Sequence, residues 1–492
     1  MDVLINGEWR GSSDGSALGK YDPSTGKLMY RFPSCTKDDV KAAIDAAAGT
    51  WEGWNSLGSK KRSEILYRAR DRMSRRRHEL EEILVRENGK ITIEAMEEVD
   101  GVLDQLTYYA EFARKITGSI VEGGSEDRRI MQYKVPYGVV AAITPWNFPA
   151  AMVARKLAPA LLTGNSVVLK PSSDTPGSAE WIVRILSESG MPKGVLNMIT
   201  GRGSVVGDYL SSSSKVGLVT MTGSTATGQR IMEKASRNMA KLVLELGGKA
   251  PFIVWKDANI RNAIKTFLWA KYWNAGQSCI AAERLYVHED VYDRFMAGII
   301  NATKKLTVGN PRTSNIGPLI NKQALDTVSS FVESARKDGA KVALGGKRYK
   351  PGGRFGNGFF FQPTIIEGAG QRSRLFQEEV FGPVIGAAKV SEVDELFEAA
   401  NDSRYGLASY MFTEDYRLIM RASEAIRFGE LYVNMPGPEA SQGYHTGFRL
   451  TGQSGEGSKQ GIEEYLKLKN VYIDYSGKEL EIETVPDSAV GK

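Results

Sequence analysis

From about Gly138 onward, short apolar runs alternate with helical segments, and this alternation constrains the fold more than any other feature of the chain. The runs VVAAIT, NSVVLK, VLNMIT, VGLVTMTG and KLVLELGG each have the length of a buried strand, and helical patterns separate them. Strands spaced by helices predict a parallel sheet built from right-handed crossover units. The later runs PFIVW, ERLYVHE and LYVN repeat the pattern, which indicates a second α/β domain.

The N-terminal hundred residues have a different pattern, that of a strand pair followed by long helices. Thr36 precedes DDVKAAIDAAAG, an amphipathic run with an N-cap residue in place. We expect helices over residues 60–87 and 92–115, separated at the pair Asn88-Gly89. The alternating run IMQYKVPY predicts an exposed strand, and KNVYIDYSG predicts a late strand with an edge that could pair with another chain.

Composition and charge exclude several classes of protein. A chain of 492 residues is too long for one hydrophobic core, which predicts more than one domain. Hydrophobic residues make up 42% of the chain and charged residues 25%, as in ordinary globular proteins. The formal charge of +6, from 64 basic and 58 acidic side chains, is small and scattered, so we expect no nucleic-acid partner.

Cysteine and histidine are too scarce for a disulfide framework or a metal centre. The chain has two cysteines, Cys35 and Cys279, and three histidines that lie far apart, His78, His288 and His445. The most apolar stretch includes TPWNFP, whose prolines and asparagine do not suit a membrane span. Because the N-terminal segment MDVLINGEWRG lacks the pattern of a signal peptide, we expect a cytoplasmic protein.

A dinucleotide-binding turn is indicated by MTGSTATGQRI, in which Gly223 and Gly228 bracket a strand-to-helix turn. Glycine lets a pyrophosphate approach the backbone, and the N-terminus of the helix offers free N–H groups and the positive end of its dipole. Ligands bind at the carboxyl ends of parallel strands, which favours a cofactor site here. Glycine is also frequent at such turns for steric reasons, so the pair alone does not decide between the two interpretations.

Three further side chains have a chemical interpretation and a structural one. Cys279 in WNAGQSCIAAER is either a small buried hydrophobe or a nucleophile whose thiolate is favoured by backbone dipoles. Glu245, at the end of KLVLELGG, is either a solvated strand terminus or a general base whose pKa is raised by burial. Asn147, between the prolines of TPWNFP, is either a turn residue or an amide donor to an oxyanion.

The order of the motifs favours the chemical interpretations. TPWNFP, KPSS, TGS…G, LELGGK, GQSC and EEVFGPV follow one another, and with them the chain resembles the aldehyde dehydrogenase superfamily over essentially its whole length. Six motifs in one order make this resemblance highly specific. It implies an NAD(P)-dependent enzyme of α/β fold. Such an enzyme has a Rossmann-type parallel-sheet cofactor domain, an α/β catalytic domain and a small β bridging domain.

The resemblance also implies domain boundaries and an assembly. Residues 1–118 and 140–246 are expected to form the cofactor-binding domain, and residues 247–440 the catalytic domain. Residues 119–139 and 465–492 are expected to form the bridging domain. Subunits of such enzymes assemble through the bridging domain as dimers or tetramers, so we expect a homotetramer.

The same resemblance assigns roles to residues. Cys279 attacks the aldehyde carbon, and the Asn147 amide and the Cys279 backbone N–H hold the oxyanion. After hydride transfer, Glu245 activates the water that hydrolyses the thioester, and Glu456 in SGEGSK matches a carboxylate that relays protons. Cys35 in FPSCTKDD is expected to lie far from all of these motifs. The positions that match cofactor contacts are Trp146, Lys170, Gly223, Ser224, Glu379 and Phe381.

The preference between the two nicotinamide cofactors depends on one position. In the family, a glutamate three residues beyond the conserved lysine commonly accepts hydrogen bonds from the adenosine ribose, and its charge repels a 2′-phosphate. KPSSDTP places Ser173 at this position, with Lys170 nearby. This predicts NADP in preference to NAD. The alternative is a plain loop serine that has no effect on the preference.

Within the superfamily, NMPGPEASQGYHTGFR together with Arg155 resembles archaeal glyceraldehyde dehydrogenases first and lactaldehyde dehydrogenases next. Arg155, Glu439 and His445 match positions that contact substrate in lactaldehyde-type enzymes, which implies a polar pocket. Tyr444-His445-Thr446-Gly447 replaces the usual Pro-Phe-Gly-Gly run, so an apolar aromatic wall is not expected. The resemblance implies oxidation of D-glyceraldehyde to glycerate. Lactaldehyde and succinate semialdehyde are the alternative substrates, and the polar residues could instead lie on the surface.

Two rival functions follow from the same motifs. A cofactor-binding scaffold without catalysis is one, and the intact set of Cys279, Glu245 and Asn147 argues against it. A CoA-acylating relative that passes the thioester to coenzyme A is the other. Retention of Glu245, the water activator, argues against the second rival.

Overall fold

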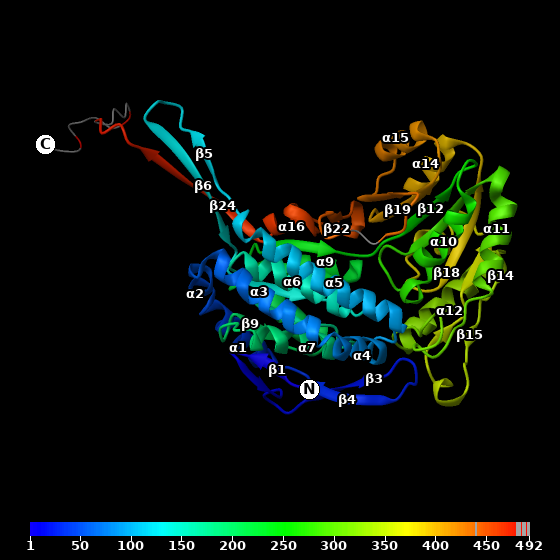
Figure 1. Ribbon diagram of the computed structural model, residues 1–492, viewed down its shortest axis with the longest axis horizontal. Helices are drawn as coiled ribbons and strands as arrows, with labels where there is room; N and C mark the ends of the chain where they lie inside the picture. Colours follow the sequence, from blue (N-terminus) through cyan, green and yellow to red (C-terminus); the bar gives the residue numbers. More distant parts are fainter. Residues whose placement is uncertain (438–439, 479–483, 485–488, 490–492) are drawn as a thin grey trace.

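The computed structural model describes residues 1–437 and 440–478, together with residues 484 and 489. Within them the chain forms two α/β lobes on separate sheets and a projecting three-stranded arm (Figure 1). In Figure 1 the lobe of the eight-stranded sheet lies at lower left, the lobe of the seven-stranded sheet at right, and the arm extends to the upper left. The two sheets are those that the alternation of strands and helices predicts.

The eight-stranded sheet has the order β2-β1-β9-β8-β7-β10-β11-β22. Its five central strands pair in parallel, and β1, β2 and β22 pair antiparallel at the two edges. Alternate residues of the central strands belong to two different hydrophobic clusters, because helices pack on both faces. The bounds are β1 (Val3–Ile5), β2 (Glu8–Arg10), β7 (Val139–Ile143), β8 (Ser166–Lys170), β9 (Leu196–Met198), β10 (Val216–Thr222), β11 (Lys241–Glu245) and β22 (Gly452–Gln453).

The helices of this lobe begin and end close to the predicted residues. The break at Asn88-Gly89 is present, and Gly89 has a φ of +86°, a conformation that favours glycine. The single helix predicted before it is two helices, because Arg76 leaves the helical conformation with a φ of −113°. The bounds are α1 (Lys37–Ala48), α3 (Gly58–Arg75), α4 (Arg77–Glu87), α5 (Thr92–Glu111), α6 (Pro149–Leu162), α7 (Pro176–Glu188) and α9 (Thr225–Ala235).

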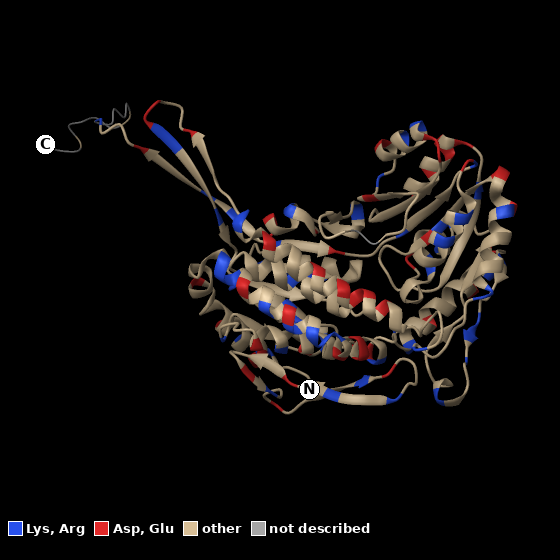
Figure 2. Ribbon diagram, in the orientation of Figure 1, with Lys and Arg blue, Asp and Glu red and all other residues tan. Residues whose placement is uncertain are grey.

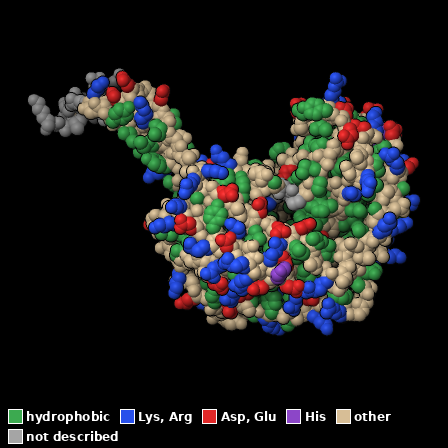
Figure 3. Space-filling model, in the orientation of Figure 1, with side chains coloured by type: hydrophobic (Ala, Val, Ile, Leu, Met, Phe, Trp, Pro, Cys, Tyr) green, Lys and Arg blue, Asp and Glu red, His purple; other side chains and the backbone are tan. Residues whose placement is uncertain are grey.

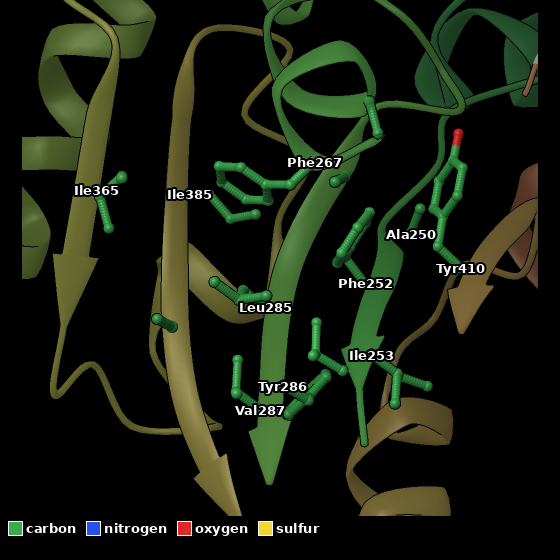
Figure 4. Close-up of a cluster of buried hydrophobic side chains, with 14 of the residues drawn as sticks. Ala250, Phe252, Ile253, Phe267, Leu285, Tyr286, Val287, Ile365, Ile385 and Tyr410 are labelled. Carbon is green, nitrogen blue, oxygen red and sulfur yellow. The ribbon is translucent and has the colours of Figure 1, made fainter. Parts of the chain in front are cut away.

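The seven-stranded sheet has the order β14-β17-β18-β13-β12-β19-β20, with β14 antiparallel at one edge and the other pairs parallel. Figure 4 shows Phe252, Leu285 and Ile385 of three adjacent strands in one core with Phe267 of helix α10. The bounds are β12 (Ala250–Val254), β13 (Ala282–His288), β14 (Lys341–Leu344), β17 (Thr364–Glu367), β18 (Val384–Val390), β19 (Ala408–Phe412), β20 (Glu430–Val433), α10 (Ile260–Tyr272) and α15 (Tyr416–Ala425).

The arm consists of β5 (Ser119–Glu122), β6 (Arg128–Pro136) and β24 (Leu466–Asp474). The late strand predicted from KNVYIDYSG is β24, and its sheet partner is β6 of the same chain. Hydrophobic side chains run along the arm in Figure 3, and Ile120 and Tyr472 are 70% and 73% exposed. The arm thus presents apolar surface that the described residues do not cover.

Positively and negatively charged residues alternate along the helices of the ribbon in Figure 2. Opposite charges on neighbouring turns pair with each other, as Arg77 does with Glu81 and Lys322 with Asp326. Among the helices that the structure describes, none is long and apolar enough to cross a membrane.

Candidate active site

A cavity of about 330 Å³ lies where the two lobes meet. Its wall takes side chains from α5 and α6, from the end of β11 and from the loop that precedes β13. The three predicted catalytic residues, Cys279, Glu245 and Asn147, all line it, as do Arg155 and His445. The fold therefore brings together in one cavity five side chains that are far apart in the sequence.

The loop that carries Cys279 follows α10 and is held in an unusual conformation. Asn274 and Ala275 have φ values of 50° and 55°, which non-glycine residues rarely adopt. The Asn274 backbone N–H donates to Glu94 Oε1 at 2.7 Å, and Gln277 Nε2 donates to the Asn274 carbonyl at 2.9 Å. Buried polar side chains thus fix the position of the loop, as a nucleophile that must meet its substrate in one geometry requires.

Asn147 lies in the turn between β7 and α6, beside the Cys279 loop. Its carbonyl accepts a hydrogen bond from Asn274 Nδ2 at 2.9 Å, which joins the two segments. A second close approach joins the same loop to the segment after β11. A Cβ atom on Gly248 would lie 2.1 Å from the Cys279 carbonyl oxygen, so only glycine fits there. The motifs TPWNFP, LELGG and GQSC are therefore in direct contact.

Glu245 ends β11 and is buried, with 2% of its surface exposed. Neither of its carboxylate oxygens has a hydrogen-bond partner among the described residues. Burial raises the pKa of Glu245 well above its ordinary value, and the positive charges of His445, Lys156 and Arg155 oppose that shift. A buried carboxylate with raised pKa and open lone pairs is suited to accept a proton from water.

A second carboxylate, that of Glu456 in β23 (Gly455–Glu456), lies in the same cavity. It forms a buried ion pair with Lys156 of α6, and Thr220 Oγ1 donates to it at 3.2 Å. Burial acts to raise the pKa of Glu456, but Lys156 and Arg155 bring it below the ordinary value. The surroundings thus shift the pKa of Glu245 upward and that of Glu456 downward, a separation typical of acid–base sites.

The residues predicted to contact substrate are only partly described. Arg155 is buried on α6, which begins at Pro149, and His445 lies in β21 (His445–Thr446). Both line the cavity, whereas Glu439 lies outside the described residues. The rest of the wall combines carboxylates with aromatic rings, namely Glu97, Glu98, Asp104, Phe148, Trp269 and Trp273.

The predicted dinucleotide turn joins β10 to α9. Ser224 is the N-cap of α9 and its hydroxyl accepts the Thr227 N–H at 3.3 Å. The Gly223 N–H donates to the Glu245 carbonyl at 2.9 Å, so the turn lies beside the end of β11. A Cβ atom on Gly228 would approach Leu246 to 2.6 Å, which shows how closely the helix packs on the strand segment. The N-terminus of α9 therefore lies at the same edge of the sheet as the cavity.

Lys170, at the end of β8, is a buried cation whose surroundings fit a cofactor. Its ammonium donates to the Pro171 carbonyl at 3.2 Å, and burial lowers its pKa to about 8. No carboxylate of the described residues forms an ion pair with it. Ser173, in the next loop, donates to the Gly201 carbonyl at 3.1 Å. A buried ammonium without an anionic partner beside a small hydroxyl side chain suits a phosphorylated ribose.

The segment EEVFGPV is anchored by Glu283 of β13. This buried carboxylate accepts hydrogen bonds from Lys249 Nζ at 2.8 Å and Lys271 Nζ at 3.3 Å. It also accepts the backbone N–H groups of Val380 at 3.0 Å and Phe381 at 3.3 Å. One charged residue of the second lobe therefore fixes the segment that carries Glu379 and Phe381.

Glu379 and Phe381 face the other predicted cofactor residues. The Gly248 N–H donates to Glu379 Oε1 at 2.8 Å, and burial raises the pKa of Glu379 to about 8. Phe381 has a φ of 53°, and its ring lies 5.3 Å from the Trp146 ring, edge to face. The structure thus places Trp146, Glu379 and Phe381 beside the segment that follows Glu245.

The sequence reasoning did not identify Lys156, Glu430 or Asn274. Lys156 has a recognisable signal, since Arg155 and Lys156 are consecutive cations in the apolar helix AMVARKLAPALL and need a buried partner. Glu430, which lies 2.8 Å from His445 Nδ1, and Asn274, which donates to Glu94, have no such signal. Only the fold brings these partners to them.

One expectation about Cys35 is wrong. Its backbone N–H donates to the Thr200 carbonyl at 2.9 Å, next to Gly201, which accepts the Ser173 hydroxyl. Cys35 therefore lies close to the predicted cofactor loop and not far from every motif. Because it is buried, the pKa of its thiol is raised to about 11, which makes it a poor nucleophile.

Comparison with known proteins identifies relatives over nearly the whole chain. Proteins named D-glyceraldehyde dehydrogenase (NADP(+)) are 65% identical in Thermoplasma acidophilum, over 99% of this chain and 98% of that protein, and 64% identical in Picrophilus torridus, over 99% of each. The crystal structure of lactaldehyde dehydrogenase from Escherichia coli superposes with a TM-score of 0.94 at 38% identity, covering 96% of this chain and 99% of that one.

The family model described as the aldehyde dehydrogenase family matches residues 9–471. Together with the relatives and the superposition, this match confirms the predicted family and fold class. The chain belongs to the aldehyde dehydrogenase family.

Proposed function

We propose that this chain oxidises D-glyceraldehyde to glycerate with NADP⁺, through a thiohemiacetal and then a thioester on Cys279. The observation that carries the proposal is the single cavity lined by Cys279, Asn147 and Glu245 together with Arg155 and His445. The names of the two relatives above 60% identity support the substrate and the cofactor.

In the proposed reaction the Cys279 thiolate bonds to the aldehyde carbon. The Asn147 amide and the Cys279 backbone N–H hold the negative oxygen that results. NADP⁺, when bound, supplies the acceptor for the hydride that leaves this carbon. Glu245 then takes a proton from water as the water oxygen bonds to the thioester carbon. The C–S bond breaks, the thiolate of Cys279 is restored and the acid is released.

The cofactor is proposed to bind at the turn after β10 and the loop after β8. Lys170 supplies a cation for the ribose or its phosphate, and Ser173 leaves the space and the neutrality that a 2′-phosphate needs. The N-terminus of α9 receives the pyrophosphate, and the remaining proposed contacts are Trp146, Gly223, Ser224, Glu379 and Phe381.

The wall of the cavity supports a short hydroxyaldehyde as substrate. His445 and Arg155 line the cavity with polar groups that a substrate hydroxyl can contact, and an unbranched alkyl aldehyde brings no hydroxyl to them. Glu97, Glu98 and Asp104 line the same cavity, so the carboxylate of succinate semialdehyde meets like charges there. Lactaldehyde, which keeps one hydroxyl, remains the second candidate.

A panel of short aldehydes assayed with NADP⁺ tests the proposal. A substrate hydroxyl that hydrogen-bonds to a charged side chain typically contributes about 1.5–3 kcal/mol, or about ten- to a hundredfold in kcat/KM. Glyceraldehyde is therefore expected to exceed propanal by at least about tenfold, and His445→Phe to narrow that gap. If propanal or hexanal is the better substrate, the polar pocket is wrong, although the family assignment stands.

The predicted domain division, assembly and location are part of the same proposal. Residues 119–139 and 465–492 are assigned to the bridging domain, of which 479–483, 485–488 and 490–492 lie outside the described residues. The arm within the described part supports a homotetramer, because Tyr472 and Leu468 leave apolar surface exposed. Cys35 and Cys279 are not joined in a disulfide, which suits the reducing cytoplasm.

A further inference from the structure

His445 lies between two glutamates that come from different lobes. Its Nδ1 is 2.8 Å from Glu430 Oε1, and its Nε2 is 3.9 Å from Glu245 Oε2. All three side chains are buried, with at most 9% of each exposed. The other oxygen of Glu430 accepts the Tyr432 hydroxyl at 2.9 Å. Since an ionised carboxylate only accepts, Nδ1 of His445 must donate, and Nε2 faces Glu245.

Charge balance around His445 favours the imidazolium form. The register of β21 and β23 places Glu456 directly opposite His445, and α6 supplies Lys156, which pairs with Glu456, and Arg155, whose charge also acts on Glu456. When Glu245 is ionised, as water activation requires, three carboxylates among the described residues, of Glu245, Glu430 and Glu456, thus meet two permanent cations. With His445 protonated the positive and negative charges are equal in number. With His445 neutral, one buried negative charge is left uncompensated, which is costly.

We propose that Glu430 and His445 form a charged pair whose imidazolium holds Glu245 as the carboxylate that accepts the proton of the hydrolytic water. Glu430 is a positioning residue in this arrangement, because it acts through His445. It is absent from the described residues that line the cavity. The inference rests on the proposed function, since it concerns the thioester hydrolysis that Glu245 is proposed to promote.

The reason that Glu245 needs such a partner is its burial. Burial favours the protonated form, which cannot take a proton from water, and the side chain has no hydrogen bond that stabilises the charge within the described residues. A cation 3.9 Å away lowers the pKa of Glu245 and so opposes the effect of burial. An opposite charge within about 4–6 Å typically moves a carboxyl pKa by about one to three units. The imidazolium thus decides how much of Glu245 is ionised near neutral pH.

The test measures thioester hydrolysis alone, as a function of pH. Enzyme is mixed with one equivalent of glyceraldehyde and excess NADP⁺, samples are quenched in acid, and intact-protein mass gives the fraction of acylated Cys279 over time. The NADPH burst in the same mixing experiment reports acylation separately. In the wild type, the acid limb of the hydrolysis rate reflects ionisation of Glu245.

Glu430→Gln distinguishes the proposal from a plain charge effect by the sign of the shift. Loss of a bystander negative charge would favour ionised Glu245 and move the limb to lower pH. Loss of the carboxylate that keeps His445 protonated instead moves the acid limb to higher pH, by about one unit or more. His445→Gln is expected to give the same direction, and the double variant no larger shift than His445→Gln alone.

Two matched variants serve as controls. Glu430→Asp keeps the charge and is expected to hold the limb near its wild-type position, and Glu424→Gln removes an exposed glutamate of the same lobe without effect. The proposal is overturned if the acid limb of hydrolysis in Glu430→Gln stays in place or moves to lower pH. If that variant does not fold, the same result for the acid limb in His445→Gln overturns it. A wild type without an NADPH burst would instead contradict the proposed function.

Discussion

Replacing Lys156 by methionine removes the cation that compensates Glu456. Both side chains are buried, at 0% and 2% exposed, and they form an ion pair that also includes Thr220. Methionine keeps the length of the apolar stem, so the change removes the charge with little loss of packing. The variant therefore isolates the electrostatic contribution of one side chain to the base of the cavity.

The expected loss is large because one charge is left without its partner. Breaking a buried pair from one side typically costs about 3–5 kcal/mol of free energy of unfolding. For a folding unit of about 150–250 residues, each kcal/mol lowers the melting temperature by about 2–4 °C, so we expect a decrease of about 6–20 °C at pH 7. Lys156→Met combined with Glu456→Gln removes both charges of the pair and is expected to recover most of the lost stability.

The pH dependence gives the sign of the effect. In the wild type the pKa of Glu456 is lowered by folding, so its stabilisation is present above the unfolded value and is lost as pH falls through the folded value. In Lys156→Met, burial without the cation raises that pKa, so the penalty appears as pH rises above the unfolded value. Melting curves from pH 4 to pH 8 should show the variant approaching the wild type at acid pH. Equal melting temperatures at pH 7 would refute the reasoning.

Two further variants test the cofactor and the assembly. Ser173→Glu places a carboxylate beside Lys170 and is expected to raise the Kd of NADP⁺ by about tenfold or more and to change that of NAD⁺ much less; fluorescence titration that shows equal changes removes the argument. Leu468→Lys with Tyr472→Lys charges the exposed face of β24 and should reduce the particle mass in light scattering, whereas Met239→Lys, at an exposed position after α9, should not. An unchanged mass in the arm variant argues against assembly through β24.

Local signals were enough to predict the sheets and to make Glu245 a candidate base. Periodicity identified β7, β8, β10 and β11, because strands buried on both faces appear as short continuous apolar runs. Glu245 was accessible to prediction for the same reason, since a carboxylate that ends such a strand lies at the sheet edge where ligands bind. Cys279 and Asn147 needed the order of the motifs, because each has an ordinary structural interpretation on its own.

Contacts between distant segments were beyond reach of the sequence. Glu430 begins β20 and His445 begins a two-residue strand, and nothing in either segment indicates that the two side chains meet at 2.8 Å. The predicted position of Cys35 was wrong for the same reason, because only the fold brings its loop beside Gly201. The break between α3 and α4 is a local feature, but the sequence did not predict it. Arginine has no strong tendency to end a helix, so Arg76 did not indicate the break.

The central claim, that Cys279 carries the acyl group and Glu245 activates the water that removes it, is tested most directly in Glu245→Gln. This variant keeps the shape of the side chain but cannot accept a proton, so hydrolysis should slow far more than acylation. Rapid mixing with glyceraldehyde and NADP⁺ should give a near-stoichiometric burst of NADPH. Acid-quenched protein should then carry an acyl group that peptide mapping places on Cys279. A variant that turns over at the wild-type rate without an acyl group on Cys279, or carries it at another residue, would contradict the account.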